Sequence, residues 1–146
     1  MRPLFNMKKI TKSKIETHAF AKNFAKQLKG GEIIGLIGKL GAGKTIFTKG
    51  IAQGLGIKNT VNSPTFVLIK IYDVPNHKTI KKLCHIDAYR INKPADIISI
   101  GVKEYFNRPD TITVIEWADK IKKILPKQTR YVNIKNYSSN KRIINY

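Results

Sequence analysis

The chain has 146 residues, the usual length of one domain, and its 42% hydrophobic and 25% charged residues exclude a wholly disordered protein. One cysteine, Cys84, excludes an internal disulfide and a zinc cluster built from cysteines, and no apolar run reaches the roughly 18 residues of a membrane span. The 28 lysines and arginines against 9 acidic residues give a net charge of +19, which favours polyanionic partners. We expect a single cytoplasmic domain over residues 1–146, with no membrane contact.

The first half of the chain is predicted to alternate helix and strand. Residues 1–9 are expected to form a loose N-terminal extension. Ser13 is expected to cap a helix, because Glu16 follows three residues later. The apolar stripe of this helix, at helical spacing, consists of Ile15, Ala19, Phe20, Phe24 and Leu28. The apolar run at 33–37 predicts a buried parallel strand, and a second helix is expected at 45–55.

The second half of the chain is richer in strands. The expected order is a hairpin of strands at 66–72 and 79–86, a helix at 94–106, a strand at 111–115, a short basic helix at 118–125, and a final hairpin at 131–134 and 142–146. This order predicts an α/β fold, a three-layer domain like those of P-loop nucleoside triphosphatases (NTPases), with a mixed and mainly parallel sheet.

A phosphate-binding loop lies at residues 38–45, where the sequence fits the pattern G-x-x-x-x-G-K-[ST]. Glycines let the loop turn its backbone amides towards a phosphate, and the following helix adds its positive N-terminal end. Lys44 has the position that reaches the β- and γ-phosphates, and the Thr45 hydroxyl has the position that ligates Mg²⁺. Because the loop follows an apolar strand and opens a helix, its context supports the motif.

Two acidic residues come directly after predicted strands: Asp87 after the strand at 79–86, and Glu116 after the strand at 111–115. Ligands of open α/β sheets lie at the carboxyl ends of the strands, so we expect both acids beside the phosphate loop. One of them can hold Mg²⁺, directly or through water, and the other can orient an attacking water.

Four segments together resemble the TsaE family of ATPases, formerly called YjeE, over roughly residues 10–135. They are the phosphate loop, Val-Asn-Ser-Pro-Thr-Phe at 61–66, His-Ile-Asp-Ala-Tyr-Arg at 85–90 and Ile-Glu-Trp at 115–117. The resemblance implies an accessory protein that hydrolyses ATP slowly with Mg²⁺. It would act with the TsaD and TsaB proteins in the threonylcarbamoyladenosine modification of tRNA next to the anticodon.

The resemblance also implies roles for single residues. Asp87, Glu116 and Thr65 are expected to be catalytic, Thr65 as part of a switch-like loop, and Thr45 and Glu116 are expected to ligate Mg²⁺. Trp117 would line the site or a partner surface. ATP is expected to contact Gly38, Leu40, Gly41, Ala42, Gly43, Lys44, Thr45, Ile46 and Arg142. The chain departs from the family pattern at three positions, which are Lys39, Ile46 and Ala95.

Two other functions remain open at this point. A small-molecule phosphoryl-transfer kinase needs an arginine-rich lid, but the five arginines of this chain are scattered. A basic RNA-binding module is the other, although 23 of the 28 basic residues are lysines, whose AT-rich codons offer a compositional explanation of the charge. Cys84 and His85 fall in a predicted strand, where a buried packing role is expected for Cys84 and a structural role is favoured for His85.

Overall fold

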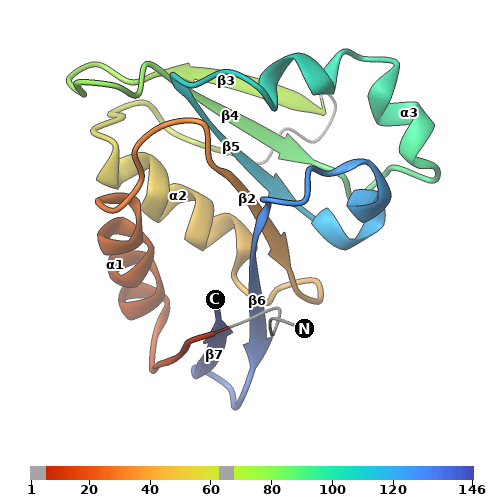
Figure 1. Ribbon diagram of the computed structural model, residues 1–146. Helices are drawn as coiled ribbons and strands as arrows, with labels where there is room; N and C mark the ends of the chain where they lie inside the picture. Colours follow the sequence, from red (N-terminus) through yellow and green to blue (C-terminus); the bar gives the residue numbers. More distant parts are fainter. Residues whose placement is uncertain (1–5, 63–67) are drawn as a thin grey trace.

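The computed structural model describes residues 6–62 and 68–146, and within these residues one seven-stranded sheet has the order β1-β7-β6-β2-β5-β4-β3 (Figure 1). Its strands are β1 (Lys8–Thr11), β2 (Ile33–Ile37), β3 (Ile69–Asp73), β4 (Lys82–Asp87), β5 (Thr111–Glu116), β6 (Arg130–Asn136) and β7 (Arg142–Asn145). The helices are α1 (Lys14–Ala25), α2 (Lys44–Gly54), α3 (Pro94–Ile98) and two 3₁₀ segments, η1 (Val102–Tyr105) and η2 (Ala118–Ile124).

The sheet is mixed, with a parallel centre. β2 pairs in parallel with both β5 and β6, and β4 pairs in parallel with β5. The outer pairings, β3 with β4, β6 with β7 and β1 with β7, are antiparallel. Only β3 and β7 therefore run against the other five strands, which confirms the predicted mixed and mainly parallel sheet. The two predicted hairpins, β3–β4 and β6–β7, are also present.

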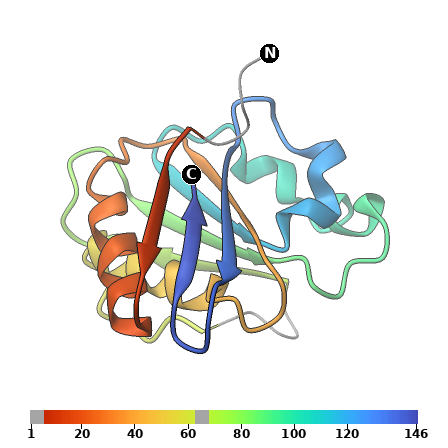
Figure 2. The same ribbon diagram turned by 90° about the horizontal axis from the view of Figure 1, so that it is seen from below.

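Helices cover both faces of the sheet, as Figures 1 and 2 show, and this confirms the three layers. α1 and α2 lie on one face, where a core cluster contains Ile34, Leu36 and Phe47. α3, η1 and η2 lie on the other, over a second cluster that includes Ile33 and Ile115. Since β2 is buried on both faces, its continuous apolar run has a direct physical reason.

The start of α1 follows the predicted capping box. The Ser13 hydroxyl accepts from the Glu16 amide at 3.1 Å, and a Glu16 carboxylate oxygen accepts from the Lys12 amide at 2.6 Å. The predicted apolar stripe was partly wrong, because Ile15 is 82% exposed and Ala19 is also exposed. The buried residues of α1 are Thr17, Ala21, Phe24 and Ala25. Apolar residues lie all around this helix, so packing against α2 selected the buried face.

Several predicted elements differ in extent. The helix expected at 94–106 ends at Ile98 and resumes as η1, because Gly101 takes a left-handed φ of 82° between them. The helix expected at 118–125 is the 3₁₀ segment η2. The strand expected from residue 66 begins at Ile69 as β3, and residues 66 and 67 lie outside the described residues.

The N-terminus contains a strand that the sequence did not indicate. Lys8–Thr11 forms β1 and pairs with β7, from Lys8 opposite Asn145 to Thr11 opposite Arg142. The prediction of a loose extension over residues 1–9 was therefore wrong for residues 8 and 9. A short edge strand that begins with two lysines has no sequence pattern that indicates a strand, because its stability comes from the partner strand. In the described part of the chain, no helix has both the length and the apolar character needed to cross a membrane.

Cys84 lies in β4 and is completely buried, as expected for a small packing residue. Burial raises the pKa of its thiol to about 12, so the thiol stays protonated at neutral pH. We expect no alkylation of the folded protein by iodoacetamide at about pH 8, and complete alkylation in guanidinium chloride. Mass spectrometry measures both. Rapid labelling of the folded protein would contradict the burial of this strand.

Candidate active site

The phosphate loop connects β2 to α2 and is shaped by its glycines. Gly41 and Gly43 have left-handed φ values of 78° and 114°, a backbone region that residues with a Cβ atom rarely adopt. Gly43 is the N-cap of α2 and has no side chain to cover the first turn. The amides at the start of this 11-residue helix therefore face the loop, where the helix dipole favours an anion.

Lys44 is buried at the base of the loop. Its ammonium donates to the carbonyl oxygens of Gly38 at 2.6 Å and Lys39 at 2.9 Å, and lies 4.0 Å from the ring centroid of Trp117. Burial lowers the pKa of Lys44 from its ordinary value, and the carboxylates of Glu116, Asp119 and Asp87 act in the opposite direction. The Lys44 ammonium is thus held by the carbonyl oxygens of the phosphate loop itself.

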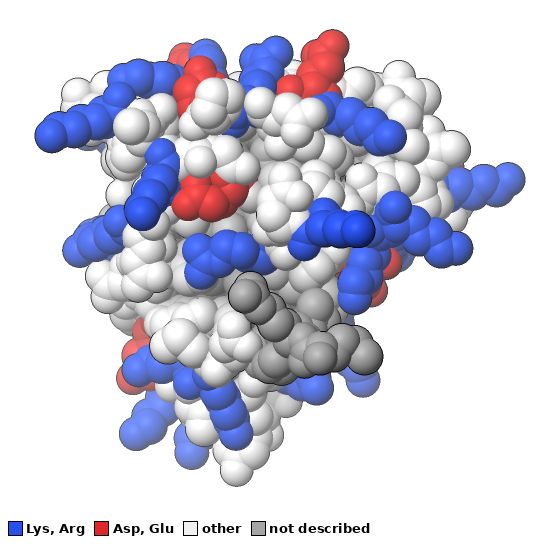
Figure 3. Space-filling view, in the orientation of Figure 1, with Lys and Arg blue, Asp and Glu red and all other residues white. Residues whose placement is uncertain are grey.

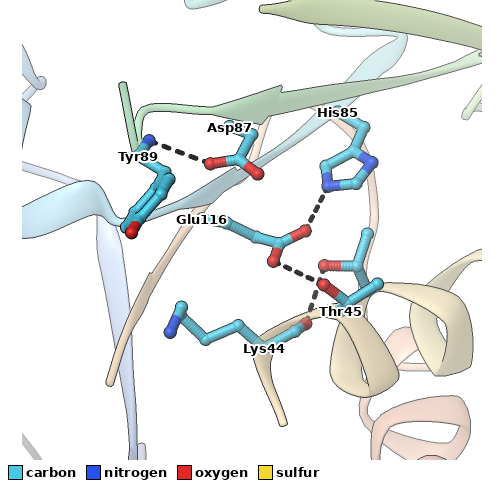
Figure 4. A network of polar contacts seen from close by, with 7 residues as sticks. Lys44, Thr45, His85, Asp87, Tyr89 and Glu116 are labelled. Carbon is cyan, nitrogen blue, oxygen red and sulfur yellow. Dashed lines mark hydrogen bonds and ion pairs between the residues drawn. The ribbon is translucent and has the colours of Figure 1, made fainter. Parts of the chain in front are cut away.

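Thr45, Glu116 and His85 form a continuous polar network, drawn in Figure 4. The Thr45 hydroxyl donates to Glu116 Oε1 at 2.8 Å, and His85 Nε2 lies 2.5 Å from Glu116 Oε2. Glu116 is 2% exposed and His85 is fully buried. The network joins the first turn of α2 to the ends of β5 and β4, so the two residues expected at the metal are in direct contact.

Asp87 lies beside Glu116, because the two residues are opposite each other in the parallel ladder of β4 and β5. One of its carboxylate oxygens accepts from the Tyr89 amide at 2.9 Å. The centroid of the Tyr89 ring lies 5.0 Å from the ring centroid of Trp117, the residue that follows Glu116. Trp117 is the one residue other than glycine with a positive φ in the described ranges, at 60°. The acid-bearing strand ends are thus bordered by two aromatic rings.

Arg142 reaches the loop from β7. Its Nε donates to the carbonyl oxygen of Ala42 at 2.8 Å, and the residue is 7% exposed. This contact places the predicted C-terminal arginine at the phosphate loop, 100 residues away in the sequence. A buried guanidinium beside the loop amides adds positive charge to the anion site.

The structure brings most of the predicted residues around one cavity of about 380 Å³. Its lining includes the predicted residues Leu40, Gly41, Gly43, Lys44, Thr45, Ile46, Asp87, Glu116 and Arg142. Gly38 and Ala42 line a neighbouring cavity of about 630 Å³ on the other side of the loop. The predicted Thr65 lies outside the described residues, so its place relative to the cavity is not described.

Three residues of this region were missed or given another role in the sequence. Lys14 and Tyr89 line the same cavity, and His85 contacts Glu116. Strand alternation could have indicated that His85 lies near the site, because residues 85 and 87 of one strand point to the same face of the sheet. For Lys14 there is no local signal, since only the packing of α1 beside the loop brings it near.

The oxygen atoms of Thr45 and Glu116 fit a magnesium ion. Mg²⁺ prefers oxygen ligands and is usually held by one or two carboxylates together with substrate phosphates and water. The described residues contain no group of three His, Cys, Asp or Glu side chains that could hold a metal alone. A hydroxyl and a carboxylate oxygen are a donor set of the kind that binds Mg²⁺ together with nucleotide phosphates.

Comparisons with known proteins show the family of this chain. The family model described as "Threonylcarbamoyl adenosine biosynthesis protein TsaE" matches residues 11–144. The tRNA threonylcarbamoyladenosine biosynthesis protein TsaE of Bacillus subtilis (strain 168) is 40% identical over 131 residues, which are 90% of this chain and 78% of that protein. The protein of the same name from Rickettsia typhi is 42% identical over 132 residues, 90% of this chain and 88% of that protein.

A solved structure is similar over almost the whole chain. The crystal structure of Bacillus subtilis YdiB matches with a TM-score of 0.76 and 37% sequence identity. The match covers 95% of this chain and 82% of that one. At this identity and coverage, the similarity extends over nearly the whole fold.

Proposed function

The chain belongs to the TsaE family, and on that premise we propose that it is a magnesium-dependent ATPase with slow intrinsic turnover. It acts as an accessory protein in the threonylcarbamoyladenosine modification of tRNA next to the anticodon, together with TsaD-like and TsaB-like proteins. The observation that carries the proposal is the direct contact of Thr45 with Glu116 at the mouth of a phosphate loop. This contact joins a phosphate-binding helix to a carboxylate at a strand end, as nucleotide hydrolysis requires.

In this proposal the loop and Arg142 bind the triphosphate of ATP. The loop amides from Gly38 to Ile46 surround the phosphates, and Lys44 exchanges its two carbonyl contacts for phosphate oxygens. Arg142, held by Ala42, adds a second cation on the side of β7. The side chain of Leu40 is exposed, so we assign its predicted contact to its backbone amide. The Ala42 amide donates to the Lys39 carbonyl oxygen at 3.0 Å, so its predicted contact is not assigned to that amide.

The two carboxylates have different tasks. Glu116 and the Thr45 hydroxyl hold Mg²⁺, which when bound neutralises developing charge on the phosphates. Asp87, opposite Glu116 on the neighbouring strand, orients the attacking water. We also propose a catalytic role for Thr65, as the family resemblance implies. This division follows the family resemblance and the depth of the two acids, since Glu116 is buried and Asp87 is only partly buried.

Reconstitution tests the proposed function. The matching TsaD and TsaB proteins are incubated with tRNA, a preformed activated threonylcarbamoyl donor and ATP, with and without this chain, and the modified nucleoside is measured by mass spectrometry. We expect multiple turnover only when the chain is present, and none with Lys44→Ala. If the chain instead transfers phosphate to an added metabolite and leaves the modification unchanged, the kinase hypothesis replaces the proposal.

Hydrolysis by the isolated chain is expected to be slow and to increase when the partner pair is added. The five arginines are scattered, and the rate gain of an added arginine finger is ~10³–10⁵ where one acts. Lysine and arginine side chains are spread over the face of the molecule drawn in Figure 3, and acidic side chains are fewer there. If the partner surface is acidic, added salt should slow association. Fast phosphate release by the chain alone, unchanged by partners, would reject this prediction.

A further inference from the structure

We propose that His85 is a positioning residue: its ring holds the Glu116 carboxylate in the orientation that a divalent cation between Glu116 and Thr45 requires. This inference rests on the proposed function, because it takes Glu116 and Thr45 as the metal ligands. Nothing in the sequence motif assigns this task to His85, whose position inside a strand favoured a structural role. The evidence is the contact geometry and the burial of the three side chains.

The Glu116 carboxylate is held at both oxygens. Thr45 approaches Oε1 at 2.8 Å, and His85 Nε2 approaches Oε2 at 2.5 Å (Figure 4). A carboxylate only accepts hydrogen bonds, so Nε2 carries the proton and donates. Glutamate has three rotatable side-chain bonds, and a contact at one oxygen alone leaves the plane of the carboxylate free to turn. The second contact, from His85, therefore fixes the direction of the lone pairs that face the phosphate loop.

The strands bring His85 to this place with little freedom. His85 is two residues before Asp87 on β4, and Glu116 is two residues after Val114 on the neighbouring strand β5. His85 is paired with Val114 in the ladder, and all four side chains lie on the face of α2 by strand alternation. The ring is fully buried, so it has little freedom to move. It contacts one oxygen of the Glu116 carboxylate, while Thr45 contacts the other (Figure 4).

The other nitrogen of the ring supports a specific task for the imidazole. His85 Nδ1 is buried and has no hydrogen-bond partner among the described residues. A buried polar atom without a partner destabilises a fold, and an apolar side chain of the same size would avoid this penalty. Packing alone thus does not explain a histidine here. The contact of Nε2 with Glu116 does, since partners of metal ligands orient those ligands.

Two substitutions separate positioning from packing. In His85→Gln, the side-chain amide reaches the place of Nε2 and can donate to Glu116. In His85→Asn, the amide reaches only the place of Nδ1, and the donor to Glu116 is lost. Mn²⁺ replaces Mg²⁺ as the probe, and electron paramagnetic resonance measures free Mn²⁺ in the presence of ADP. ADP binding in EDTA, and the melting temperature, report whether each variant keeps an intact loop and fold.

We expect His85→Asn to weaken Mn²⁺ binding to the ADP complex by about 10–100-fold, the usual effect of removing a partner of a metal ligand. His85→Gln should stay close to the wild type, and ADP binding in EDTA should be equal in all three proteins. Equal Mn²⁺ affinity in the wild type and His85→Asn would overturn the inference, and equal losses in both variants would assign His85 to packing instead. If the wild-type ADP complex binds no Mn²⁺ at all, the proposed metal site itself is wrong.

Discussion

Replacement of Lys44 by alanine should abolish measurable ATP hydrolysis, with a loss in turnover of at least ~10²–10³-fold. The Lys44 ammonium is buried at the base of the loop, where it donates to two carbonyl oxygens. No other lysine of the loop occupies the lysine position of the motif. In the proposed ATP complex, phosphate oxygens would replace the carbonyl contacts and offset the effect of burial on the pKa of Lys44. Without the cation, the charge that develops on the γ-phosphate loses its nearest stabilising group. Steady-state phosphate release measures the loss, and calorimetry measures ATP·Mg²⁺ affinity.

Lys49→Ala is the matched control for this variant. Lys49 lies on the same helix α2, is exposed, and does not line the cavity of the site. Its replacement removes the same charge from the chain and should leave turnover and ATP affinity unchanged. If Lys44→Ala binds and hydrolyses ATP like Lys49→Ala, the phosphate loop is not the nucleotide site.

The second large effect is expected at the two carboxylates, which should fail in different ways. Glu116→Ala should weaken Mn²⁺ binding to the ADP complex by more than ~100-fold, since even a partner of a metal ligand contributes ~10–100-fold. Asp87→Asn should keep ADP and Mn²⁺ binding but lower turnover by ~10²-fold or more, because a carboxylate that orients the attacking water acts only in the chemical step. Metal titration and phosphate release together distinguish the two.

Glu104→Gln serves as the control for the acids, because Glu104 is exposed on η1 and does not line the cavity of the site. It should retain metal binding and turnover. If Asp87→Asn loses the metal and Glu116→Ala loses only turnover, the roles of the two acids are exchanged. Turnover like the wild type in both variants would show that the two strand ends do not share a catalytic site.

Much of the fold was predictable where the signal is local. The capping box at Ser13 and the apolar run of β2 each depend on residues within one turn or one strand, and both predictions were confirmed. The same applies to the glycine-rich loop, in which Gly41 and Gly43 adopt left-handed backbone angles. The stripe of α1 was partly wrong because apolar residues surround that helix, so its own sequence offers more than one face to bury.

The candidate site shows the same division. The motif and the strand ends pointed to Lys44, Thr45, Asp87 and Glu116, and the structure places all four around one cavity. The contact of His85 with Glu116 was not predicted, although strand alternation put His85 on the correct face. Its partner lies on another strand, and one sequence does not state which strands are neighbours or in which register they pair.

By itself, the sequence determined the chemistry available to this protein: a phosphate loop with its lysine and threonine, two acids at strand ends, and a basic surface. Only the tertiary structure decided which of these groups meet. Thr45 contacts Glu116 across 71 residues, Arg142 contacts Ala42 across 100, and β1 exists only as the partner of β7. Local patterns follow from the backbone preferences of a few neighbouring residues. Contacts between distant residues follow from strand order, register and the burial of apolar faces, which the whole chain decides together.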